Sequence, residues 1–66
     1  MSAIDINKVR AGDVFASRLN PEVRIRVVAT RGSSLDVETL RADGTGIRAR
    51  NIAWGTLREN YRMGTP

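Results

Sequence analysis

Residues 23–50 read VRIRVVATRGSSLDVETLRADGTGIRAR, and the apolar and charged residues of this stretch alternate. Ile25 and Val27, for example, are each preceded by an arginine. Because successive side chains of a β-strand point to opposite faces, each such run has one apolar face and one charged face. This alternation is typical of an antiparallel sheet that is buried on one side only. The expected charged face consists of Arg24, Arg26, Asp36, Glu38, Arg48 and Arg50.

Two clusters of turn residues divide this stretch into three predicted strands. The first cluster, Arg31-Gly32-Ser33-Ser34, separates a strand at 23–30 from a strand at 35–40. The second cluster, Ala42-Asp43-Gly44, is expected to be a three-residue hairpin loop that ends on a left-handed glycine. It leads into a strand that ends at residue 50.

The length of the second hairpin loop predicts how its two strands pair. A three-residue loop sets Arg41 opposite Thr45, and the register then follows residue by residue along both strands. The predicted pairs are Glu38 with Arg48, Val37 with Ala49, and Asp36 with Arg50. In the first hairpin, the corresponding register sets Arg26 opposite Glu38. Glu38 is therefore expected to lie between two arginines.

The remaining segments are shorter and carry weaker patterns. Asn20-Pro21-Glu22 is expected to be a loop, because proline restricts the backbone of the residue before it. After residue 50 the alternation stops, and residues 51–57 are expected to form one helical or 3₁₀ turn that fills one end of a barrel. The other predicted segments are a lead-in at 1–11, a turn and first strand at 12–16, a last strand at 61–63 and a frayed tail at 64–66.

Five short strands within 66 residues predict a single all-β domain over residues 1–66, a small five-stranded SH3-like barrel. A short 3₁₀ or helical turn is expected before its last strand. Closure of the barrel would remove the unpaired edges that an open sheet exposes. A chain of this length buries only about 60% of the surface of its unfolded form, so its stability is expected to be marginal. The predicted core consists of Val14, Ile25, Val27, Leu35, Val37, Ile47, Ile52 and Leu57, with Ile6, Val9 and Met63.

The composition favours a soluble chain that attracts polyanions. Eleven basic residues stand against 7 acidic ones, so the net charge of +4 predicts weak, salt-sensitive attraction to nucleic acid. All the basic residues except Lys8 are arginine, which fits either phosphate recognition or a GC-rich genome. The chain contains no cysteine, no apolar run of the roughly 20 residues that a membrane span needs, and no signal-peptide pattern in its first five residues. A cytoplasmic protein without a membrane partner is therefore expected.

Four short motifs resemble one group of small proteins. They are Gly12-Asp13-Val14-Phe15, Val23-Arg24-Ile25-Arg26-Val27-Val28, Ile47-Arg48-Ala49-Arg50-Asn51-Ile52, and Leu57 with Tyr61-Arg62-Met63. Together they resemble the small uncharacterised SH3-like or KOW-like β-barrel proteins of actinobacteria and their phages, over residues 12–63. The resemblance implies a fold and a bacterial or phage-infected host cell, and it implies no catalytic residues. The chain departs from the group at Trp54-Gly55, where the others have a charged or proline-containing turn.

The residue types argue against catalysis and against a bound cofactor. Without histidine or cysteine, the chain has no Ser-His-Asp or Cys-His nucleophile system. Asp36 and Glu38 share the charged face, but they are expected to pair with arginines across the sheet. The acidic residues lack the spacing of a calcium loop, and Gly44-Thr45-Gly46 lies between strands, where no phosphate-binding helix follows. We therefore expect no enzyme activity, no metal, no cofactor and no small-molecule substrate.

Nucleic-acid binding is the first of two binding functions that the sequence supports. Arginines on a curved sheet, with aromatic side chains nearby, combine phosphate contacts with a stacking platform. The candidate contacts are Arg24, Arg26, Arg48 and Arg50, with Arg41 in the connecting turn. Because acids lie on the same face, a second interpretation stays open, in which this face is only solvated and its charges largely cancel.

A protein-interaction module is the second possibility, directed at a host protein or at a second copy of the chain as a homodimer. Small barrels often serve as adaptors, and aromatic residues are frequent interface anchors. The candidate partner contacts are Trp54, Tyr61 and Phe15. Trp54 could equally cap an undersized core. Val28 and Leu40 fall on the charged face, where they could form an apolar patch or a dimer contact.

Overall fold

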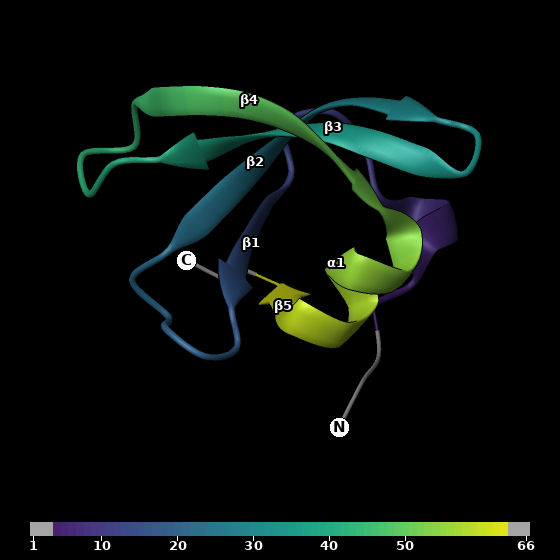
Figure 1. Cartoon of the computed structure of the whole chain (residues 1–66), viewed down its shortest axis with the longest axis horizontal. Coiled ribbons are helices and arrows are strands. Elements are labelled where there is room, and N and C mark those ends of the chain that lie inside the picture. The colour runs from purple at the N-terminus through teal and green to yellow at the C-terminus, as the bar shows by residue number, and fades with distance from the viewer. Residues whose placement is uncertain (1–3, 64–66) are drawn as a thin grey trace.

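Five antiparallel strands and one short helix make up the fold (Figure 1). The computed structural model describes residues 4–63, so the frayed tail predicted at 64–66 and the first three residues of the predicted lead-in lie outside the described residues. In chain order, the elements are a 3₁₀ turn η1 (Ile6–Lys8), β1 (Val14–Ser17), β2 (Arg24–Arg31), β3 (Ser34–Leu40), β4 (Gly46–Ala53), α1 (Trp54–Asn60) and β5 (Tyr61–Met63). The strands form one sheet in the order β4-β3-β2-β1-β5.

The prediction of a mainly β fold is confirmed, but the sheet does not close into a barrel. β4 and β5 occupy the two ends of the strand order and do not pair with each other. Each of them therefore has one edge without a strand partner among residues 4–63. The short helix α1 follows β4, precedes β5 and contacts both (Figure 1). Because a barrel requires every strand to pair on both sides, the predicted closure is wrong.

The inner face of the bent sheet carries the hydrophobic core. Its fully buried side chains are Phe15, Ile25, Val27, Leu35, Val37 and Leu57. Burial of each such side chain contributes about 1.5–3 kcal/mol. Ile4, Ile52 and Tyr61 complete the core, and Ile6, Val9 and Trp54 pack against it while half-buried.

Three of the predicted core residues lie elsewhere. Ile47 and Met63 are each 54% exposed, so their assignment to the core is wrong. Val14 is half-buried and lies opposite Arg26, which places it on the outer face of the sheet, away from the core. Phe15, which the sequence placed at a binding surface, is buried instead.

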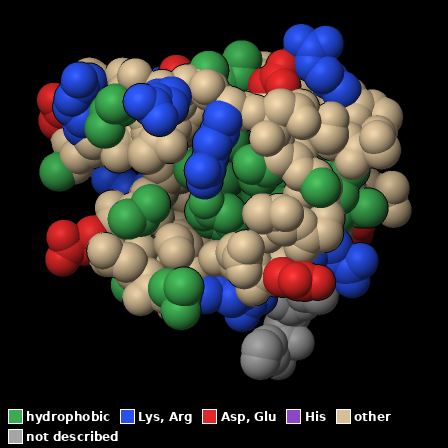
Figure 2. All heavy atoms as spheres, in the orientation of Figure 1, with side chains coloured by type: hydrophobic (Ala, Val, Ile, Leu, Met, Phe, Trp, Pro, Cys, Tyr) green, Lys and Arg blue, Asp and Glu red, His purple; other side chains and the backbone are tan. Residues whose placement is uncertain are grey.

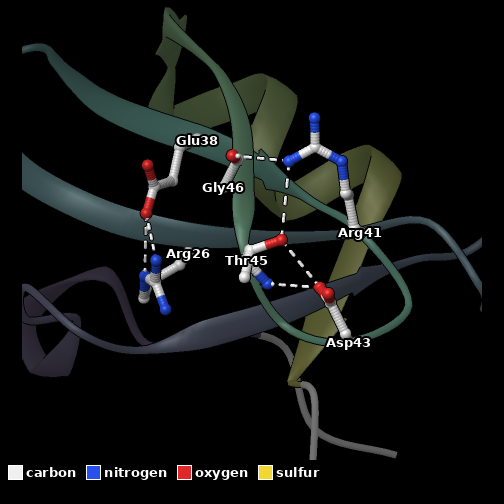
Figure 3. Close-up of polar contacts among 6 residues, drawn as sticks. All are labelled: Arg26, Glu38, Arg41, Asp43, Thr45 and Gly46. Carbon is white, nitrogen blue, oxygen red and sulfur yellow. Dashed lines mark hydrogen bonds and ion pairs between the residues drawn. The ribbon is translucent and has the colours of Figure 1, made fainter.

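The hairpin loop between β3 and β4 has the predicted geometry. Gly44 has a φ of 90°, in the left-handed region that favours glycine. The Arg41 N–H donates to the Thr45 carbonyl over 2.8 Å, and the Gly44 N–H donates to the Arg41 carbonyl over 2.9 Å. Asp43 Oδ1 accepts hydrogen bonds from both the backbone N–H and the hydroxyl of Thr45, over 2.9 and 2.7 Å (Figure 3). These contacts confirm the prediction that Arg41 lies opposite Thr45.

The register of β2 against β3 is also the predicted one over its first half. Arg26 lies opposite Glu38, and Val27 lies opposite Val37. Beyond this point Val28 has no partner, and Ala29 lies opposite Asp36. Such an extra residue is a β-bulge, which increases the local twist of the sheet.

The register of β3 against β4 differs by one residue from the predicted one. Leu40 lies opposite Gly46, but Thr39 lies opposite Arg48, so Ile47 is an extra residue in β4. This second bulge moves every later residue of β4 by one position along β3. The observed pairs are Glu38 with Ala49, Val37 with Arg50 and Asp36 with Asn51, so the predicted partners of these three β3 residues are wrong.

α1 starts and ends three residues later than the predicted helical turn at 51–57. Residues 51–53 continue β4, and the helix then runs from Trp54 to Asn60. Leu57 is its buried residue and fills the core from this side. Trp54 Nε1 donates to the Gly32 carbonyl over 2.9 Å, which ties the helix to the turn between β2 and β3.

Candidate anion-binding surface

The bulge at Ile47 distributes the predicted arginines over both faces of the sheet. Arg24 and Arg26 alternate with core residues of β2 and therefore lie on the outer face. Directly opposed residues of antiparallel strands share a face. Arg50 lies opposite the core residue Val37, which places Arg50 and its i−2 neighbour Arg48 on the inner face. The single arginine face predicted from the sequence is therefore wrong.

Acids neutralise two arginines of the outer face. Arg26 forms an ion pair with Glu38, in which Arg26 Nε donates to Glu38 Oε1 over 3.0 Å (Figure 3). Arg31 Nε donates to Asp36 Oδ2 over 2.6 Å. Asn51 Nδ2 donates to Asp36 Oδ1 over 3.0 Å. Because its charge is already paired, Arg26 is a weaker phosphate contact than the sequence indicates.

Hydrogen bonds lower the pKa values of two carboxyl groups, those of half-buried Asp36 and exposed Asp43. For Asp36 the main cause is the hydrogen bond from the side chain of Asn51, followed by the hydrogen bond from Arg31. For Asp43 the main cause is the hydrogen bond from the Thr45 hydroxyl, followed by the one from the Thr45 backbone N–H. Both groups are therefore fully ionised at neutral pH.

Acid is expected to destabilise the fold through these two carboxylates. A carboxyl group whose pKa is lower in the folded chain stabilises that chain above the ordinary pKa of 3.8, and the contribution disappears as the pH falls through the folded pKa. The free energy of unfolding, measured by urea denaturation, should therefore fall between about pH 5 and about pH 2. The variant Asp36→Asn should lose less of its stability over this range. A carboxyl titration by NMR that gives Asp36 or Asp43 a folded-state pKa of 3.8 or above would contradict this expectation.

Arg24 and Arg62 flank a hollow on the outer face. Each lies opposite Ala16 of β1, with Arg24 on the β2 side and Arg62 on the β5 side. The small side chain of Ala16 forms part of the lining between them, together with Pro21, Glu22, Ala42 and Met63. Neighbouring strands lie about 4.8 Å apart, so the two arginine Cα atoms are about 10 Å apart. Two guanidinium groups on flexible stems can reach a common anion across that distance.

The charges of this hollow are not neutralised by an ion pair. Arg24 and Arg62 take part in no salt bridge within residues 4–63. Arg24 Nη2 makes one long hydrogen bond, of 3.5 Å, to the Ala42 carbonyl. Glu22 lines the same hollow, but two arginines against one glutamate leave it positive.

Arg41 lies beside this hollow, in the hairpin loop that also supplies Ala42. Its guanidinium donates to the Gly46 carbonyl over 3.2 Å and to Thr45 Oγ1 over 3.5 Å (Figure 3). Both acceptors are uncharged, so Arg41 keeps its full positive charge. We define Arg24 and Arg62 of the outer face, together with Arg41 of the adjacent hairpin loop, as the arginine end.

The two inner-face arginines lie at the open side of the sheet. Arg50 Nη2 donates to the phenol oxygen of Tyr61 over 2.8 Å, which links β4 to β5 where the two strands do not pair. Arg48 lies opposite Thr39 and is exposed. Figure 2 shows basic side chains beside and over hydrophobic side chains on the face seen in that view. Arg48 and Arg50 thus lie on the face of the sheet opposite to that of Arg24 and Arg62.

The three predicted aromatic contacts have different surroundings. Phe15 is fully buried, so it contacts no partner in this fold. Tyr61 is buried in the core, and its hydroxyl oxygen accepts the hydrogen bond from Arg50. Trp54 is half-buried and hydrogen-bonded to Gly32, and its role as a partner contact stays a prediction. None of the three lies in the lining of the hollow between Arg24 and Arg62.

Sequence reasoning missed Arg62 as a site residue. Its place beside Ala16 depends on the pairing of β1 with β5, strands that lie far apart in the chain. The sequence signal that could have found Arg62 is the alternation of apolar Tyr61, charged Arg62 and apolar Met63. In a strand, this alternation places Arg62 on the face opposite to Tyr61.

Comparisons with known proteins add no relative to this description. No protein-family model, no curated protein and no solved structure matches the chain. The resemblance to small proteins of actinobacteria and their phages therefore stays a prediction. Within residues 4–63, no group of three or more His, Cys, Asp or Glu side chains is placed to hold a metal ion. No helix of this part of the chain is long and apolar enough to cross a membrane.

Proposed function

We propose that the chain is a non-enzymatic binding module that recognises nucleic acid through the phosphate groups of its backbone. The observation that carries this proposal is the positive hollow between Arg24 and Arg62, whose guanidinium groups take part in no ion pair within the described residues. Arginine donates several hydrogen bonds in a planar fork, which suits phosphate oxygens. Contacts of this kind bind the backbone without reading its sequence.

The distribution of acids over the outer face supports this location. Glu38 and Asp36 pair with Arg26 and Arg31 and so leave the middle of the face nearly neutral. The arginine end is outside these pairs. A phosphate backbone is therefore attracted to one end of the outer face rather than to the whole sheet.

The fold assignment forms part of the same proposal. The strand order β4-β3-β2-β1-β5, with a short helix between β4 and β5, supports an SH3-like arrangement that remains open on one side. We place the protein in the cytoplasm of a bacterium or of a phage-infected host cell. The cytoplasmic location rests on the composition of the sequence, and the bacterial or phage-infected host rests on the sequence resemblance.

A salt series with labelled random DNA and RNA oligonucleotides tests the proposal. Three phosphate contacts predict a slope of log affinity against log salt near −2.7 on duplex DNA, because each contact contributes about −0.9. The double variant Arg24→Ala/Arg62→Ala should make this slope shallower by about 1.8. Fluorescence anisotropy gives both slopes.

The double variant Arg10→Ala/Arg58→Ala is the matched control, because it removes the same charge from the lead-in and from α1. In the control, the affinity for the oligonucleotide should fall slightly because the net charge is lower, whereas the salt slope should be nearly unchanged. Equal losses of slope in the two double variants would show that net charge, and not the arginine end, attracts the oligonucleotide. Absence of salt-sensitive binding at tens of micromolar would reject nucleic-acid binding itself.

A further inference from the structure

β4 is a long strand whose outer edge has no partner among residues 4–63. It is the last strand of the sheet on its side, and it runs for 8 residues from Gly46 to Ala53. In Figure 1 it forms the upper rim of the molecule, with β3 next to it. Every second residue of such a strand directs its N–H and C=O groups away from β3. These groups offer a row of hydrogen bonds to an added strand.

The charges of β4 indicate the chemistry of that strand. The strand sequence is GIRARNIA, which contains two arginines and no acid. Arg48 and Arg50 are two residues apart and share the inner face. Arg50 is held in place by its hydrogen bond to Tyr61, whereas Arg48 has no salt bridge in the described part of the chain. An added strand would bring two of its own side chains next to these arginines.

A second copy of this chain does not fit the same edge. Side chains that lie directly opposite each other share a face, so an antiparallel β4–β4 pair with a continuous inner face must oppose inner-face residues. If residue 48, 49 or 50 of one copy lies opposite the same residue of the other, Arg48 or Arg50 of one copy lies opposite Arg48 or Arg50 of the other. Directly opposed like charges are destabilising. The bulge at Ile47 further distorts the edge and disfavours pairing between identical strands.

We propose that the β4 edge binds an extended acidic segment of another protein by strand addition. The partner strand carries Asp or Glu at alternate positions, which lie opposite Arg48 and Arg50 on the inner face. Its backbone pairs with the outward N–H and C=O groups of β4. Ile47, which is 54% exposed at the bulge, contacts an apolar side chain of the same strand. This surface is separate from the arginine end, so either binding activity can exist without the other.

Synthetic peptides that alternate glutamate with valine test this proposal. Anisotropy should show binding of the acidic peptide and none of a peptide that alternates lysine with valine. N-methylation at alternate backbone nitrogens keeps the charge but removes hydrogen bonds, and it should weaken binding about tenfold or more. Amide hydrogen exchange of the intact chain should show new protection in β4 when the acidic peptide is added.

Two charge-reversal variants separate the β4 edge from the rest of the molecule. Arg48→Glu places an acid beside Arg50, opposite a glutamate of the added strand, and it should therefore abolish binding of the glutamate peptide. Arg24→Glu changes the net charge equally on the other face, and it should leave peptide binding unchanged and weaken oligonucleotide binding. The proposal is overturned if both variants weaken peptide binding equally, if no β4 amide gains protection, or if the acidic peptide does not bind. It is likewise overturned if sedimentation shows that free chains dimerise and Arg48→Glu abolishes the dimer.

Discussion

Replacing Phe15 by alanine is expected to leave the fold only marginally stable at room temperature. Phe15 is fully buried in the core, and removal of a buried phenylalanine ring costs about 3–5 kcal/mol. A stability of 0.05–0.15 kcal/mol per residue gives a chain of 66 residues about 3–10 kcal/mol in total. The substitution therefore removes half or more of the stability of an average chain of this size.

Urea denaturation followed by far-UV circular dichroism measures this effect. Met63→Ala is the matched control, because Met63 lies opposite Phe15 in the sheet and is 54% exposed. Met63→Ala should lower the free energy of unfolding by less than about 1 kcal/mol. An unchanged midpoint for Phe15→Ala, together with loss of binding to a partner, would instead support the surface role that the sequence indicated for Phe15.

Leu57→Ala is expected to have the second-largest effect and to lower the free energy of unfolding by about 2–5 kcal/mol. α1 has 7 residues, and Leu57 is its buried residue. A helix this short is unstable in water by itself, so its contact with the core holds it in place. Loss of the leucine side chain should therefore release α1 and weaken the attachment of β5, which follows it directly.

The fluorescence of Trp54, the single tryptophan of the chain, reports the state of α1 directly. In Leu57→Ala its emission should shift towards that of exposed indole at lower urea concentrations than in the parent chain. Leu19→Ala provides the control, because the Leu19 side chain is 94% exposed and its removal should change stability by less than about 0.5 kcal/mol. Equal midpoints for Leu57→Ala and Leu19→Ala would mean that α1 contributes no packing energy.

Local features of the fold could be predicted from the sequence. The loop Ala42-Asp43-Gly44 was predicted correctly, because a three-residue turn with a terminal glycine has few possible geometries. The pair Arg26–Glu38 was also predicted correctly, although Val28 is an extra residue between this pair and the turn, because the alternation of Ile25 and Val27 with arginines decides which residues of β2 face outward. In both cases the deciding residues are close together in the chain.

The register of β4 could not be predicted in the same way. Ile47-Arg48-Ala49-Arg50 alternates strictly, and shifting it by one residue exchanges an isoleucine and an alanine for two arginines. On a central strand this exchange would bury charge, and the hydrophobic pattern would decide the register. On an edge strand at an open side of the sheet, the long arginine side chains can reach solvent from either face. Arg50 also donates a hydrogen bond to the Tyr61 hydroxyl group. The alternation therefore does not distinguish the two registers.

The candidate site was predicted only in part, because it combines distant segments. Arg24 and Arg41 were among the predicted contacts, but Arg62 joins them only through the β1–β5 pairing. Conversely, the pattern around Phe15 did not reveal that it fills the core, because its neighbours Val14 and Ala16 are also apolar. A β-strand that is apolar on both faces gives no signal about which face is buried.

The pairing of β1 with β5 has a consequence for the order of folding. The β2–β3 and β3–β4 hairpins join neighbours in the chain, whereas 43 residues separate Arg18 from Tyr61, whose carbonyl accepts a hydrogen bond from Arg18 Nε over 3.2 Å. Contacts between distant residues close a long loop and form slowly. The strands from β1 to β4 can therefore pair as hairpins between chain neighbours before β5 is added. The other edge of β1 stays unpaired until β5 arrives, and apolar core residues remain accessible to chaperones until then.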